Sequence, residues 1–88
     1  MDRRLLKAGR AALGWSQSEL ADQAGVQRLV VARYENGTQT PHPTTMIKLV
    51  KALSDCGVDE IKLADGSVGI ILRAEAFAAE AEGILRDK

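Results

Sequence analysis

The chain has 88 residues, and its 12 lysines and arginines balance its 12 aspartates and glutamates to a formal net charge of zero. This length fits one domain, or one small domain with a dimerisation element, and the 45% hydrophobic content permits a small core that gains from oligomerisation. The single cysteine, Cys56, excludes an intramolecular disulfide and a cysteine metal cluster. The sequence has no signal peptide and no apolar run near the ~20 residues of a membrane span, so we expect a soluble cytoplasmic protein.

The first helix is predicted over residues 2–13, where apolar residues return at helical spacing. Leu6 and Leu13 fall on one face of this segment, and Gly14 marks its end. Trp15 follows between helices, and we expect it to fill the core rather than to stack on a nucleic-acid base.

Two short helices, near residues 17–24 and 28–35, are predicted next, with a hinge at Gly25. Ser16 and Glu19 have the spacing of a capping box, in which the serine hydroxyl accepts from the glutamate backbone N–H and the carboxylate reaches back. Gly25 ends the first of these helices because glycine takes the left-handed conformation that β-branched residues resist. This arrangement places a second helix in a DNA major groove.

A longer helix is predicted from Pro43 to about Ser54, because proline at the first helical position loses no hydrogen bond. His42, the only histidine, precedes it at the expected cap, and Gly57 is the expected stop. We expect Cys56 to be a small buried residue near the helix end. The apolar stripe of this helix consists of Met46, Leu49, Val50 and Leu53.

A two-stranded hairpin is predicted within residues 59–73, on either side of Asp65-Gly66, a dipeptide typical of hairpin turns. An isolated hairpin is marginal in water, so we expect this one to pack on the helices or to pair with a second subunit. The alternating apolar residues are Ile61, Leu63, Val68, Ile70 and Leu72.

Residues 74–86 are rich in alanine and glutamate and predict a terminal helix. A short helix needs a surface against which to bury its apolar stripe, in this subunit or in a second copy. We therefore predict that residues 57–88 form a dimerisation element. The candidate interface residues are Ile70, Leu72, Phe77, Ala81, Ile84 and Leu85.

The charges are divided unevenly along the chain, although they cancel overall. Residues 1–53 contain eight basic and four acidic residues, a net +4, whereas residues 54–88 contain four basic and eight acidic residues, a net −4. This division favours a basic half that meets phosphate and an acidic half that faces away, although a skew of this size also arises by chance.

An ordered set of residues across the first two thirds of the chain follows one pattern. Its members are Gln17, Leu20, Ala21, Gly25, Val26, Val31, Tyr34, Glu35, Asn36, Gly37, Pro41, Pro43, Leu49 and Leu53. This pattern resembles the helix-turn-helix domain of the phage repressor and Cro type, an XRE-like regulator, over roughly residues 3–56. The resemblance implies a bundle of four or five helices that binds operator DNA, usually as a dimer. With the hairpin and terminal helix, we expect a mainly α fold with a DNA-binding domain over residues 1–56 and a second element over residues 57–88.

The outward positions of the second helix of the hinged pair are the candidates for reading DNA bases. The resemblance implies base contacts by Arg28, Leu29 and Arg33, with Gln27 at the start of the helix. Arginine suits guanine because its guanidinium can donate to O6 and N7 together. Leu29 has no donor, so we expect it to contact a thymine methyl group or, alternatively, to pack on a neighbouring subunit or loop.

Four further residues are candidates for contacts with the DNA backbone. The resemblance implies a phosphate contact by Gln17, helped by the helix N-terminus, where free N–H groups favour anions. Asn36 and Thr38 follow the second helix and are expected at a phosphate, or else to serve only the turn. Arg3 adds a phosphate contact or belongs to a solvated face.

A different role is expected for Arg10 and Glu35. The resemblance implies a partly buried salt bridge between them, which joins the first helix to the end of the base-reading helix. The loss of one partner would leave a buried charge unpaired. We therefore assign this pair a structural role and no direct contact with DNA.

These patterns together predict a small DNA-binding transcriptional regulator. We expect a dimeric repressor that binds an inverted-repeat operator, and the resemblance adds autoregulation as a further expectation. The expected partners are double-stranded operator DNA and a second copy of the chain, and we expect no membrane association. The alternative is a protein-interaction module, such as an antitoxin that neutralises a partner protein and binds its own promoter. We expect no enzyme, cofactor or metal site, because His42 stands alone between prolines.

Overall fold

The structure, a computed structural model, describes residues 1–77 of the chain. Its elements in order are α1 (Arg3–Ala12), α2 (Gln17–Ala24), α3 (Arg28–Glu35), α4 (Pro43–Asp55), β1 (Val58–Lys62) and β2 (Val68–Leu72). Residues 75–77 are also helical. This is the mainly helical fold with a hairpin that the sequence predicts. No helix in the described part of the chain is long and apolar enough to span a membrane.

The helix ends follow the local signals of the sequence. The Ser16 side chain accepts from the Glu19 backbone N–H at 3.0 Å, and the Glu19 carboxylate accepts from the Ser16 N–H at 3.1 Å, which confirms the capping box. Gly25 ends α2 in the left-handed conformation, with φ of 70°. His42 caps α4 by accepting from the Thr44 N–H at 3.2 Å, and Pro43 is the first helical residue, as expected.

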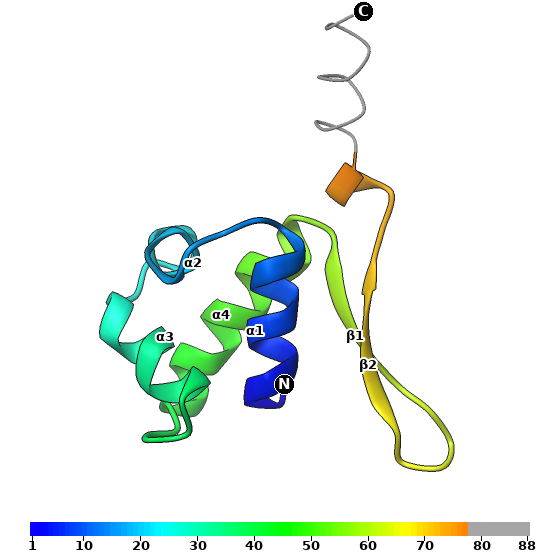
Figure 1. Ribbon diagram of the computed structural model, residues 1–88, viewed down its shortest axis with the longest axis horizontal. Coiled ribbons are helices and arrows are strands. Elements are labelled where there is room, and N and C mark those ends of the chain that lie inside the picture. The colour runs from blue at the N-terminus through cyan, green and yellow to red at the C-terminus, as the bar shows by residue number, and fades with distance from the viewer. Residues whose placement is uncertain (78–88) are drawn as a thin grey trace, which may run out of the picture.

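The helices enclose one apolar core. Its fully buried large side chains are Leu6, Leu20, Val31, Leu49, Leu53 and Val58. Trp15 is half-buried against this core, which confirms its predicted packing role. Figure 1 shows α1 between α3 on one side and the hairpin on the other, and residue contacts join α1 to both. The core therefore fixes the position of α3 relative to the rest of the bundle.

Val58 is a core residue that the sequence analysis did not identify, because the predicted hairpin segment began at residue 59. Its side chain is completely buried. A Cβ atom added at Gly9 would lie 3.0 Å from Val58 Cγ1, so a side chain at this position would require Val58 to shift. The first residue of the hairpin thus belongs to the same core as the helices.

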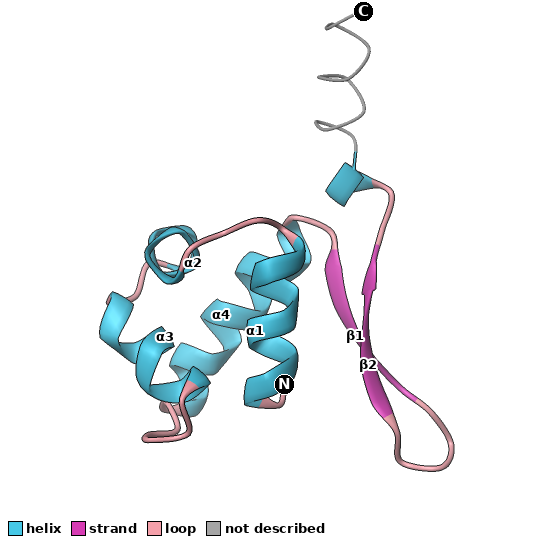
Figure 2. Ribbon diagram, viewed as in Figure 1, coloured by secondary structure: helices cyan, strands magenta, loops and turns pink. Residues whose placement is uncertain are grey.

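The hairpin is antiparallel, with Ile61 opposite Gly69, and it packs on α1 and α4 (Figure 2). Ile70 and Leu72 are half-buried against the core. Leu63 departs from the predicted alternation of apolar strand residues, because β1 ends one residue earlier, at Lys62. The Leu63 N–H donates to the Ser67 carbonyl at 2.8 Å within the turn. Leu63 is therefore an exposed turn residue and not part of a buried strand face.

Arg73 joins the end of the hairpin to the end of α4. Its guanidinium donates to the Asp59 carboxylate and, at 2.7 Å, to the Ser54 carbonyl near the end of α4. The hydrogen bond from Arg73 holds the pKa of Asp59 below its usual value. Cys56, which we expected to be buried, is half-buried here because it caps α4 at the edge of the core.

Candidate nucleic-acid interface

Helix α3 has an inner face and an outer face. Val31 is fully buried, and Val30 and Tyr34 are half-buried, so these three residues form the inner face. The outward residues predicted to read bases are all exposed: Gln27, Arg28, Leu29 and Arg33. The structure thus leaves all four predicted residues open to solvent, Gln27 at the N-cap of α3 and the other three on the helix itself.

The outer face of α3 contains two positive charges that no carboxylate neutralises in the described part of the chain. None of the ion pairs found among residues 1–77 includes Arg28 or Arg33. Leu29 lies between them in sequence, and 47% of its surface is exposed. Within residues 1–77, this helix therefore presents one exposed leucine and two guanidinium groups outside any ion pair, and this apolar and cationic chemistry fits the edges of bases in a major groove.

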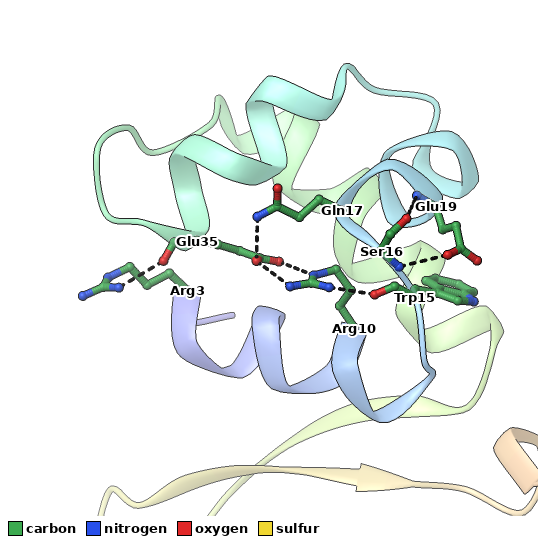
Figure 3. Close-up of polar contacts among 7 residues, drawn as sticks. All are labelled: Arg3, Arg10, Trp15, Ser16, Gln17, Glu19 and Glu35. Atoms are coloured by element: carbon green, nitrogen blue, oxygen red, sulfur yellow. Dashed lines mark hydrogen bonds and ion pairs between the residues drawn. The ribbon is translucent and has the colours of Figure 1, made fainter.

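Glu35, the last residue of α3, is buried and paired with Arg10 of α1 (Figure 3). Arg10 Nε donates to Glu35 Oε2 at 2.7 Å, and Arg10 Nη2 donates to Glu35 Oε1 at 2.9 Å. The two side chains are only 14% and 3% exposed. Arg10 Nη1 also donates to the Trp15 carbonyl at 2.7 Å. The ion pair expected from the resemblance is present, and its hydrogen bonds raise the pKa of Arg10.

Gln17 joins the same network, which the sequence analysis did not foresee. Its side-chain nitrogen donates to Glu35 Oε1 at 3.2 Å, and the residue is half-buried at the start of α2 (Figure 3). No local pattern indicates a bond between residues 18 positions apart. Glu35 thus orients the side chain that was predicted to contact a phosphate.

Asn36 and Thr38 form the turn that follows α3. Asn36 Oδ1 accepts from the Thr38 N–H at 2.9 Å, and the same N–H donates to the Arg33 carbonyl at 2.9 Å. This backbone donor is thus used within the turn. The groups with which these two exposed residues can approach a phosphate are the Asn36 amide nitrogen and the Thr38 hydroxyl.

Arg3 lies against the end of α3 in the described structure. Its Nη1 donates to the Glu35 carbonyl at 3.2 Å, and its guanidinium covers Gly37. The sequence predicts a phosphate contact or a solvated position for Arg3. It gives no sign of this internal bond, because the bond depends on the packing of α1 against α3.

The candidate interface residues of the C-terminal part have different environments. Ile70 and Leu72 are half-buried against the core of the same chain, whereas 48% of the Phe77 surface is exposed. Ala81, Ile84 and Leu85 lie outside the described residues. Within residues 1–77, no group of three histidine, cysteine, aspartate or glutamate side chains is placed to hold a metal ion.

Comparisons with known proteins identify the same region of the chain. A family described as helix-turn-helix matches residues 6–61, which include all of α2, α3 and α4. Among curated proteins, Antitoxin HipB of Escherichia coli O6:H1 is 33% identical over 48 residues, which are 54% of this chain and 51% of that protein. The chain thus spans about half the length of the curated relative it matches.

Proposed function

Since this chain belongs to the XRE-type helix-turn-helix family of DNA-binding regulators, we propose that it is a transcriptional repressor that binds an inverted-repeat operator as a homodimer. The single observation that supports this most strongly is the outer face of α3, where Arg28, Leu29 and Arg33 are exposed and the two arginines join no ion pair within residues 1–77. The family consists of DNA-binding regulators and not of enzymes.

In this proposal, α3 enters the major groove and its outer face contacts base edges. Arg28 and Arg33 are about 7.5 Å apart along the helix axis at ~1.5 Å per residue, a distance of about two base-pair steps. Each guanidinium can donate to O6 and N7 of one guanine, and Gln27 lies at the start of the helix. The operator half-site then contains two G·C pairs near a thymine that Leu29 contacts.

Contacts with the DNA backbone would fix the position of α3. The candidate residues lie at the two ends of the helix pair α2 and α3. Gln17 is in the first turn of α2, and Asn36 and Thr38 form the turn after α3. Residues 57–88 would form the dimerisation element, which sets the distance between the two copies of α3. A cytoplasmic repressor of this kind acts where its operator overlaps a promoter, including its own.

Selection of bound sequences from a random duplex pool tests this function. Salt must be fixed near the physiological value, since phosphate contacts make affinity depend steeply on salt. We expect a two-fold symmetric motif whose half-sites are about one helical turn, ~34 Å, apart. Recovery of no motif, with only weak and salt-sensitive binding, would contradict a sequence-specific repressor.

A second candidate function is supported by the relative, whose name describes it as an antitoxin. Such a protein would neutralise a partner protein and also bind its own promoter. Under this alternative, the affinity for a partner encoded beside this chain would exceed the affinity for any selected duplex. Copurification of the chain with products of its flanking genes separates the two candidates, since a repressor alone needs no such partner.

We predict that Leu29 detects thymine methyl groups in the operator. Replacing the contacted thymine by uracil removes one methyl group and should weaken binding about three- to fivefold, the effect of one buried methyl. The measurement is a titration of the unmodified and uracil-containing operators. The Leu29→Ala variant is the control and should bind both duplexes equally; equal sensitivity in both proteins would show that Leu29 does not contact the methyl group.

A further inference from the structure

The last turn of α3 depends on α1 for one hydrogen bond. The final carbonyls of a helix have no partner within it. Here the Ala32, Arg33 and Tyr34 carbonyls accept from backbone N–H groups of residues 36–39, whereas the Glu35 carbonyl accepts from Arg3 Nη1 at 3.2 Å. Arg3 therefore completes the cap of α3 and places a positive charge at its C-terminus, where the helix dipole favours it.

Gly37 allows the guanidinium of Arg3 to reach this position. A Cβ atom added at Gly37 would lie 3.4 Å from both Cζ and Nε of Arg3, which places the guanidinium in contact with this position of the turn. The φ of Gly37 is also +81°, which disfavours any other residue. The turn after α3 and the arginine of α1 therefore lie against each other at Gly37.

Two other contacts hold the same turn of α3 to the N-terminal part of the chain. The Tyr34 hydroxyl donates to the Met1 carbonyl at 2.6 Å, and the Glu35 carboxylate is paired with Arg10. Figure 3 shows Arg3 and Arg10 approaching Glu35 from one helix, one at its carbonyl and the other at its carboxylate. Arg33, a proposed base-reading residue, lies two residues before Glu35 on the same turn.

We infer that Arg3 is a positioning residue for DNA recognition: it fixes the end of α3 and acts through Arg33, rather than neutralising a phosphate. This inference rests on the proposed function. A positioning role affects the sequence-specific contacts, because they depend on the orientation of α3. A phosphate contact affects binding to any duplex and contributes about 0.9 to the slope of log affinity against log salt concentration.

The test compares wild type with Arg3→Ala on the selected operator and on a random duplex, between 50 and 200 mM salt (roughly the range over which phosphate contacts are resolved). We expect operator affinity to fall about three- to tenfold, as for one lost hydrogen bond, with random-duplex affinity and the salt slope unchanged. If the slope falls by about 0.9 and both affinities drop by the same factor, Arg3 contacts a phosphate and the inference is wrong.

Arg4→Ala is the matched control, since it removes the same charge from the same helix at a side chain that is 80% exposed. It should leave the ratio of operator to random-duplex affinity unchanged. Amide hydrogen exchange gives a readout without DNA: Arg3→Ala should speed exchange at residues 36–39, and Arg4→Ala should not. Unchanged exchange in Arg3→Ala would overturn the positioning role, whereas a wild-type protein without operator preference would overturn the proposed function itself.

Discussion

Replacing Glu35 by alanine is expected to lower the free energy of unfolding by about 3–5 kcal/mol. The loss is large because Arg10 would remain buried without its carboxylate partner, with its side chain only 14% exposed. Gln17 would lose the acceptor for its side-chain amide as well. Urea unfolding followed by far-ultraviolet circular dichroism measures the change, provided that the unfolding free energy falls with urea concentration at the same slope in the variant and the wild type.

The matched control is Asp55→Ala, which breaks the pair of Lys51 and Asp55 on α4. These side chains are 70% and 61% exposed, so we expect a loss of at most about 1 kcal/mol. Replacing Arg10 and Glu35 together by methionine should restore part of the stability, because no unpaired charge then remains. If Glu35→Ala lost no more stability than Asp55→Ala, water would have to reach the pair of Arg10 and Glu35, and the expectation would be wrong.

Most of the fold could be predicted because its signals are local. The capping box of Ser16 and Glu19, the left-handed Gly25 and the first-position Pro43 each need only a few neighbouring residues to take effect. Val58 was missed because a single apolar residue after a glycine has no periodicity. Val58 enters the core because β1 passes close to Gly9 of α1, and this contact exists only in the folded chain.

The candidate site likewise has a part that could be predicted from local spacing and a part that depends on the folded chain. The outward positions of α3 follow from helical spacing once the inner face, with Val31, is identified. The bonds of Arg3 and Gln17 to Glu35 could not be predicted, since they join residues 32 and 18 positions apart. The resemblance predicts a phosphate contact for Gln17, and Arg3 is predicted at a phosphate or on a solvated face. The structure gives each of them a partner at the end of α3, so these two residues and the helix with the candidate base-reading residues are parts of one network.

Replacing Arg28 and Arg33 together by alanine is expected to have the largest effect on operator binding. Each arginine that donates to a guanine contributes about 1–3 kcal/mol of discrimination, so the double variant should lose about 2–6 kcal/mol, or roughly 30-fold to more than 10⁴-fold in affinity. Both side chains are exposed and unpaired within the described residues, so the substitutions should leave the stability of the fold nearly unchanged. Competition binding at fixed salt measures the effect.

Lys48→Ala is the control, because it removes a positive charge from an exposed position on another helix, α4. The decisive comparison is between the operator and a random duplex. If both arginines read bases, the single variants should each relax the selected motif at one base position and reduce the preference for the operator. If instead both duplexes lose affinity equally, the arginines neutralise phosphates, and the specificity of the protein must come from Leu29, Gln27 or the shape of the DNA.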